Sequence, residues 1–159
     1  MDYREPFRQL LSWSARPRSW TRGLLAFVVL ALSTSVPAAS QQVVMVVHPA
    51  TNVTSVSKAE LSKIYLKRLR SWTSGEHVAP VDQIPGPLRE TFSREVHGRS
   101  VITIEIFWKR MIFSGRAVPP PEAGNDEAVL EFVRSTPGAV GYVSPEATLR
   151  GVRRLTVTE

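Results

Sequence analysis

The segment PVDQIPGPLRETF, residues 80–92, combines a short extended run, a tight turn and the start of a helix. The first turn of a helix leaves backbone N–H groups without intrahelical partners, and such groups attract anions. We therefore consider this turn as a candidate anion-binding site. Its candidate ligand-binding residues are Asp82, Gly86, Leu88 and Arg89, and Arg89 would be the nearby cation.

The remaining polar residues show no pattern of catalysis or metal binding. His48, His77 and His97 lie far apart, and no acid stands at metal-ligand spacing beside them. The sequence has no glycine-rich phosphate loop after a strand and no G-x-S-x-G elbow. We predict no catalytic residues, no metal site and no cofactor, and we expect each histidine at the surface or half-buried. An enzyme with paired carboxylates stays open as a weaker alternative, since the sequence does not show which acids meet.

Basic residues gather near the ends of two predicted helices, at Lys63, Lys67, Arg68 and Arg70 and again at Lys109, Arg110 and Arg116. Cations near a helix C-terminus complement the helix dipole and keep the surface soluble, and this is the interpretation we favour. An anion-binding or partner-binding surface is the alternative. We predict Trp72 and Trp108 as core or half-buried residues rather than stacking platforms.

Residues 1–39 have the pattern of a secretory signal peptide. Five arginines precede the uncharged run GLLAFVVLAL at 23–32, and small residues at 36–38 offer a cleavage site. A membrane span needs about 20 apolar residues, and this run is about half as long. We predict a signal peptide at 1–39 and a single domain at 40–159. An uncleaved membrane anchor is the alternative.

Charge and cysteine content narrow the class of protein further. The net charge of the whole chain is +6, and residues 1–39 contribute five arginines less two acids, which leaves +3. Nucleic-acid binding needs a dense basic face, so we predict no nucleic-acid partner. The absence of cysteine excludes disulfides and a lipid-accepting cysteine after the apolar run. We predict a periplasmic domain that has no membrane attachment after cleavage.

Hydrophobic periodicity and capping residues predict alternating strands and helices. The predicted strands are 42–48, 77–82, 139–143 and 153–158, and the predicted helices are 57–68, 86–98, 101–115 and 125–138. Ser57 and Glu60 have the spacing of a capping box. The start of the third helix near Ser100 stays open, because its β-branched beginning also suits a strand. The proline-rich stretch at 118–126 is predicted as a stiff surface loop.

These elements predict an α/β fold, a three-layer-type sandwich with a small mixed sheet flanked by helices. The β-branched run at 42–48 is apolar throughout, which is typical of a strand buried on both faces. Strands buried on both faces are typical of parallel or mixed sheets, so we predict that residues 42–48 lie in such a sheet.

Four segments taken in order resemble the phosphate-binding proteins of ABC importers. They are LSKIYLKRLRSWTSGEHVAPVD, LRETFSREV, FWKRMIFSGRAVPP and TPGAVGYV. In that family an Ile-Phe/Tyr-Leu-Gly-type helix end precedes a Trp, and Pro-Gly-Ala-Ile-Gly-Tyr-Val closes a lobe. The resemblance extends over about residues 43–143, and it is closer to small, single-lobe exported relatives. It implies one lobe of a type II periplasmic binding protein, namely the second of the two lobes in full family members.

The resemblance also indicates what this chain has lost. In the family, the strand-to-helix turn carries Arg-x-Asp-Gly-Ser-Gly-Thr ahead of a Phe, and its hydroxyls, amides and arginine hold phosphate. Aligned on residues 89–92, the Ser-Gly-Thr positions fall on Gly86, Pro87 and Leu88, and the Arg position falls on Asp82. Two hydroxyls, one cation and one amide donor are missing, and a carboxylate has been added. We therefore expect the fold without tight phosphate binding, because charge-assisted hydrogen bonds cannot be replaced by Leu88.

Two functions follow from this comparison. The first is an exported, non-catalytic substrate-binding-like domain linked to phosphate or anion uptake, with a small oxyanion or a periplasmic or membrane protein as its partner. The alternative is a periplasmic protein-interaction or sensory module that uses the exposed cleft face of a single lobe. A contiguous apolar patch would favour a protein partner, whereas a polar concave face with converging N–H groups would favour a solute.

Overall fold

The computed structural model describes residues 42–159, so the predicted signal peptide at 1–39 lies outside the described residues. The main sheet has four strands in the order β3-β6-β1-β7. These strands are β1 (Val44–Val47), β3 (Ala79–Pro80), β6 (Ala139–Val143) and β7 (Arg153–Arg154). β1 pairs antiparallel with β6 and β7, whereas β3 pairs parallel with β6. The sheet is therefore mixed, as predicted.

Two further pairs of short strands complete the β-structure. β2 (Ser55–Ser57) runs parallel to β8 (Thr156–Thr158), and β4 (Asp82–Gln83) runs parallel to β5 (Glu122–Ala123). The second pair corrects the prediction of a plain surface loop at 118–126. Backbone hydrogen bonds from Asp82 N to Pro121 O (2.9 Å) and from Ile84 N to Ala123 O (3.0 Å) attach this stretch to β4. The extended backbone next to prolines suits such an edge strand.

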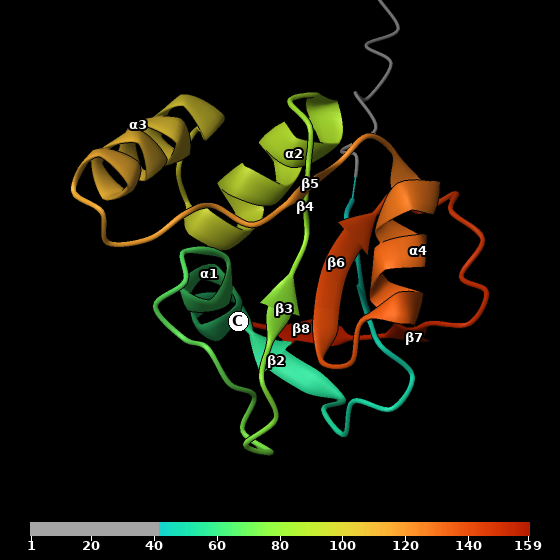
Figure 1. The fold of residues 1–159 in the computed structure, drawn as a ribbon. Coiled ribbons are helices and arrows are strands. Elements are labelled where there is room, and N and C mark those ends of the chain that lie inside the picture. Colours follow the sequence, from blue (N-terminus) through green and yellow to red (C-terminus); the bar gives the residue numbers. More distant parts are fainter. Residues whose placement is uncertain (1–41) are drawn as a thin grey trace, which may run out of the picture. The chain divides into compact units, whose positions relative to one another are not determined.

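The helical segments are α1 (Lys58–Tyr65), α2 (Pro87–Phe92), the π-helical turn η1 (Ser93–His97), α3 (Val101–Phe113) and α4 (Asp126–Ser135). Figure 1 shows α4 beside β6 on one side of the main sheet, and α1 and α2 on its other side. The result is the predicted arrangement of a mixed sheet flanked by helices. In residues 42–159, no helix combines the length and the apolar character that crossing a membrane requires.

The period-two alternation of β1 and β6 divides the core between the two faces of the sheet. Met45, Val47, Val140 and Tyr142 belong to a buried cluster with Leu61, Ile64 and Tyr65 of α1 and with Phe92 and Val96 of α2 and η1. Val46, Ala139 and Val143 belong to a second buried cluster with Val129, Leu130 and Val133 of α4. β1 is therefore covered on both faces, which confirms the prediction made from its apolar run.

Local capping signals set the helix ends as the sequence indicated. Ser57 and Glu60 form the reciprocal capping box of α1. Ser100 caps α3, with its hydroxyl accepting from Thr103 N, so the open question at this position is resolved in favour of a helix. Asn125 caps α4 in the same way through Ala128 N. Gly98 ends η1 in the left-handed region at φ 62°, where glycine has no Cβ penalty.

Two predicted aromatic positions are buried in the core. Trp72 and Trp108 are both 5 % exposed, which confirms them as core residues. The Trp72 indole N–H donates to Gly138 O at 3.0 Å, so its polar atom is satisfied. The predicted basic clusters also lie near helix ends, because Lys63 is in the last turn of α1 and Arg110 is in the last turn of α3.

Gly138 is needed where the chain enters β6. Its φ is 73°, and a Cβ added there would lie 2.0 Å from the carbonyl oxygen of His77. We expect Gly138→Ala to lower the free energy of unfolding by about 2 kcal/mol or more, through backbone strain and this clash. Gly124→Ala is the matched control, since its Cβ would meet nothing within 4 Å. Urea unfolding checks both variants, and equal stability of the two would contradict the close approach.

His97 is half-buried beside an aromatic cluster. Phe92 stacks on Tyr142 with ring centroids 4.1 Å apart, and the His97 ring lies edge-on to Phe92 at 5.5 Å. Its Nδ1 is 2.8 Å from Ser62 Oγ. Burial, with a smaller contribution from the charge of Arg99, lowers the pKa of His97 to about 4.

The folded domain is expected to lose stability as pH falls from 6.5 towards 4. In this window the unfolded chain binds a proton at position 97 and the folded chain does not, so unfolding takes up a proton. The expected loss between pH 7 and pH 5 is about 2 kcal/mol. His97→Gln should remove it, whereas His48→Gln should keep the wild-type dependence. Urea unfolding at the two pH values measures this, and an unchanged pH dependence in His97→Gln would refute the assignment.

Candidate functional site

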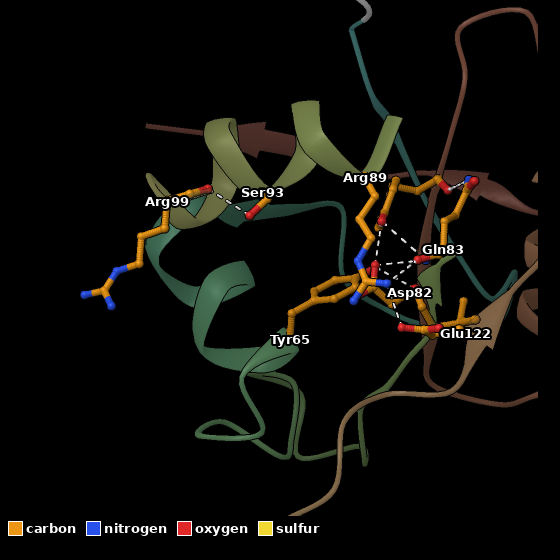
Figure 2. A network of polar contacts seen from close by, with 9 residues as sticks. Tyr65, Asp82, Gln83, Arg89, Ser93, Arg99 and Glu122 are labelled. Atoms are coloured by element: carbon orange, nitrogen blue, oxygen red, sulfur yellow. Dashed lines mark hydrogen bonds and ion pairs between the residues drawn. The ribbon is translucent and has the colours of Figure 1, made fainter. Parts of the chain in front are cut away.

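The turn singled out in the sequence connects β4 to α2. Asp82 is the first residue of β4, and Arg89 lies in the first turn of α2. Gly86 precedes the helix with extended backbone angles and no side-chain cap, and Pro87 occupies the first helical position. Figure 2 shows the Arg89 side chain reaching back from α2 towards Asp82, Gln83 and Glu122.

The guanidinium of Arg89 is buried among internal partners, and the residue is 6 % exposed. Its Nη2 lies 3.2 Å from Asp82 Oδ2, and its Nη1 lies 2.6 Å from Glu122 Oε1. Nη1 also donates to Gln83 O at 2.9 Å. Burial alone would lower the pKa of Arg89, but the two carboxylates outweigh burial and raise the pKa. Arg89 therefore stays charged, and its charge is balanced inside the protein.

Asp82 is the second buried charge, at 7 % exposure. It accepts hydrogen bonds from the Tyr142 hydroxyl and from Gln83 N, at 2.5 and 2.8 Å. Burial raises the pKa of Asp82 above its ordinary value, against the opposing effects of Arg89 and Tyr142. Burial likewise raises the pKa of Tyr142 and that of Tyr65, so both phenols stay neutral donors. Tyr65 donates its hydroxyl to Val81 O at 3.1 Å.

A second branch of the network extends to α4 through Gln83. Its Nε2 donates to Asp126 Oδ1 and to Tyr142 O, each at 2.9 Å. The other oxygen of Asp126 accepts from Ser144 N at 3.1 Å and from Ser144 Oγ at 2.6 Å. Continuous polar contacts therefore join β4, β5, α2, α4 and β6.

The structure brings together only two of the four predicted site residues. Asp82 and Arg89 meet in the buried network. Gly86 lies in the turn, where its carbonyl accepts from Glu90 N at 3.0 Å, and Leu88 is half-buried against the core. The guanidinium of Arg89 faces its internal partners rather than the turn.

Sequence reasoning did not identify Glu122 or Tyr142 as part of this site. Glu122 is 33 residues from Arg89, and Tyr142 is 60 residues from Asp82. Tyr142 lies in a strand with an apolar pattern, and Glu122 lies in the proline-rich stretch. Neither position carries a local signal of a polar partner.

The arrangement is suited to cross-linking the fold. The carboxylates of Asp82 and Glu122 both converge on Arg89 rather than on a shared reactive point. Among the described residues, no group of three or more His, Cys, Asp or Glu side chains is placed to hold a metal ion. The network is therefore a candidate structural centre at the position of the predicted anion site.

Arg89→Met is expected to lower the free energy of unfolding by about 3–5 kcal/mol, because Asp82 would keep a buried charge without its cation. Asp82→Asn in the same background should cost less than it does alone, since the two residues interact directly. Arg134→Met is the control: Arg134 contacts the exposed side chains of Glu127 and Glu131, so its loss should cost much less than the loss of Arg89. Urea unfolding of the wild type, the two single variants, the double variant and Arg134→Met measures these losses in the free energy of unfolding. Equal losses in Arg89→Met and Arg134→Met would show that burial of the pair is unimportant.

None of the protein-family models matches this chain, and no curated protein sequence matches it significantly. Solved structures do match. A protein from Clostridium perfringens, described as a phosphate ABC transporter substrate-binding protein and solved with bound phosphate, aligns with a TM-score of 0.58 at 16 % identity. An ABC-type phosphate transport receptor from Vibrio cholerae aligns with the same TM-score and identity. A possible phosphate binding protein from Planctomyces limnophilus aligns with a TM-score of 0.56 at 14 % identity.

These alignments cover 74–75 % of this chain but only 42–46 % of the three solved chains. The chain therefore spans less than half the length of the proteins that it matches, which is consistent with a single lobe. Identities of 14–16 % show the fold alone. Over its described residues, this protein has the α/β fold of about half of a phosphate ABC transporter substrate-binding protein.

Proposed function

We propose that this protein is an exported, periplasmic and non-catalytic relative of phosphate-transport substrate-binding proteins, in which the phosphate loop has become a structural element. The proposal includes a role linked to phosphate or anion uptake, through a small oxyanion or through a periplasmic or membrane protein. The single observation that carries it is the ion-pair network at the start of α2, in which the buried Arg89 contacts the buried Asp82 and the exposed Glu122.

The groups around the turn support the loss of phosphate binding there. Both terminal nitrogens of Arg89 already contact protein groups, namely Asp82, Glu122 and Gln83 O. A phosphate dianion at this turn would approach two carboxylates, and like charges at short range repel each other. Pro87 has no N–H, and Leu88 has no hydroxyl, so neither replaces the missing donors.

The absence of catalysis is part of the same proposal. The similar solved proteins are described as binding proteins or a transport receptor. The carboxylates of Asp82 and Glu122 are both paired with Arg89, and Asp82 is buried, whereas a general acid or base needs a free carboxyl group within reach of substrate. The fold shared with these binding proteins therefore supports a binding role over a catalytic one.

Thermal unfolding with and without millimolar phosphate, sulfate and nitrate tests the proposal. A micromolar site would stabilise the fold by about 4 kcal/mol at thousandfold excess of ligand. That corresponds to a rise in Tm of about 10 °C for a domain of this size. We expect no such rise with phosphate. The C. perfringens protein solved with bound phosphate is the positive control.

A phosphate-specific rise of that size in this protein would overturn the proposal that the loop is degraded. A second run with Arg89→Met then locates the site, because a phosphate site at the turn would need that cation. A rise in Tm with sulfate or nitrate but not with phosphate would support a solute-binding role for this protein with a ligand other than phosphate.

A protein-interaction module is the second candidate, and one observation favours it. Four of the large exposed apolar side chains in the described residues belong to α3, namely Ile102, Ile106, Ile112 and Phe113. Apolar residues gathered on one exposed element mark interaction surfaces in many proteins.

A further inference from the structure

Helix α3 has an apolar surface that the rest of the described domain leaves uncovered. The helix buries Ile104 and Trp108, and it exposes Ile102 at 68 % and Phe113 at 89 %. Figure 1 shows α3 at one edge of the domain, beyond α2 and away from α4. Helix α3 therefore contains more large apolar residues than it buries against the described domain.

Three exposed residues of α3 and the half-buried Glu105 have the spacing of a helix–helix seam. Ile102, Glu105, Lys109 and Ile112 follow one another at intervals of three, four and three, which are the alternating core positions of a heptad. Ile106 follows Glu105 and Phe113 follows Ile112, so both widen the apolar surface on the same side of these positions. A single stripe therefore runs along the 13 residues of the helix.

The order of charges along this stripe is complementary to itself. Glu105 precedes Lys109, with Ile102 and Ile112 outside them. If two such helices pair antiparallel, Glu105 meets Lys109 of the second copy, and Ile102 meets its Ile112. A parallel pair would place like charges opposite each other. Within residues 42–159, neither Glu105 nor Lys109 takes part in an ion pair of its own.

We propose that α3 docks antiparallel on α3 of a second copy of this chain, across a two-fold axis. Such an interface is isologous, so each contact occurs twice. At the two ends of the helix pair, Ile102 of one copy meets Ile112 of the other, and we call these the outer layers. Between them, Glu105 of one copy meets Lys109 of the other at two positions, which we call the inner layers. This inference does not depend on the proposed binding function.

The expected strength follows from the size of the helix. A helix of 13 residues is about 20 Å long, so the pair buries less than the ~800 Å² per partner of a standard interface. The dimer should therefore be weak and depend on protein concentration, with a Kd on the order of 10–100 μM. High salt should weaken the inner ionic layers.

Sedimentation equilibrium of protein purified after expression of the full chain tests the pairing. The average mass of the wild type should rise towards that of a dimer between about 1 μM and 1 mM. Glu105→Lys and Lys109→Glu should each weaken self-association at least tenfold, because each places like charges in both inner layers. An equimolar mixture of the two variants should recover the dimer, since every inner layer then pairs opposite charges.

Three controls separate pairing from folding and from net charge. Glu146→Lys makes the same charge change as Glu105→Lys at an exposed loop position and should keep the wild-type Kd. The double variant Glu105→Lys/Lys109→Glu should dimerise like the wild type. Ile106→Ser should weaken the dimer without any charge change. Far-UV circular dichroism should show the same folded signal for all variants, because Ile106, Lys109 and Glu146 are exposed and Glu105 is only half-buried.

A wild type that stays monomeric over the whole range overturns the proposal. So does a mixture of the single variants that fails to recover the dimer. In the monomeric case, binding to vesicles of anionic phosphatidylglycerol, but not to phosphatidylcholine vesicles, would assign the stripe and the neighbouring Arg110 and Arg116 to a membrane surface.

Discussion

The buried charge of Arg89 is the constraint on which this domain depends. An arginine in an apolar interior is tolerated only when carboxylates and carbonyls satisfy it, because desolvation of an ion costs several kcal/mol. Asp82 supplies one such partner from β4 and Glu122 supplies another from β5, and Gln83 O accepts a third contact. Satisfying one side chain thus brings β4 and β5 to the start of α2.

The same network bears on the proposal that the turn before α2 no longer binds phosphate. The turn contains Asp82 and Pro87, and the charge of Arg89 is balanced by the carboxylates of Asp82 and Glu122. Under that proposal the fold is kept while the site changes, because the fold requires only that the buried charge be balanced.

The aligned part of this chain corresponds to less than half of its structural relatives, and within residues 42–159 several large apolar side chains are exposed. Helix α3 is the element where this is most apparent, since it packs through Ile104 and Trp108 and leaves isoleucines and a phenylalanine in solvent. Exposed apolar surface is unfavourable in water, so a partner that covers it would be stabilising.

The sequence by itself determined the elements whose signals are local. The capping box of Ser57 and Glu60, the Asn125 cap, the stop at Gly98 and the apolar runs of β1 and β6 are each readable within a few residues. Only the tertiary structure decided that Arg89 meets Glu122 and that Asp82 meets Tyr142. It also decided that the proline-rich stretch adds a strand to β4, and that no other part of residues 42–159 covers one face of α3. The physical reason is range: capping and periodicity act over one or two helical turns, whereas charge pairing and burial depend on segments that only folding brings together.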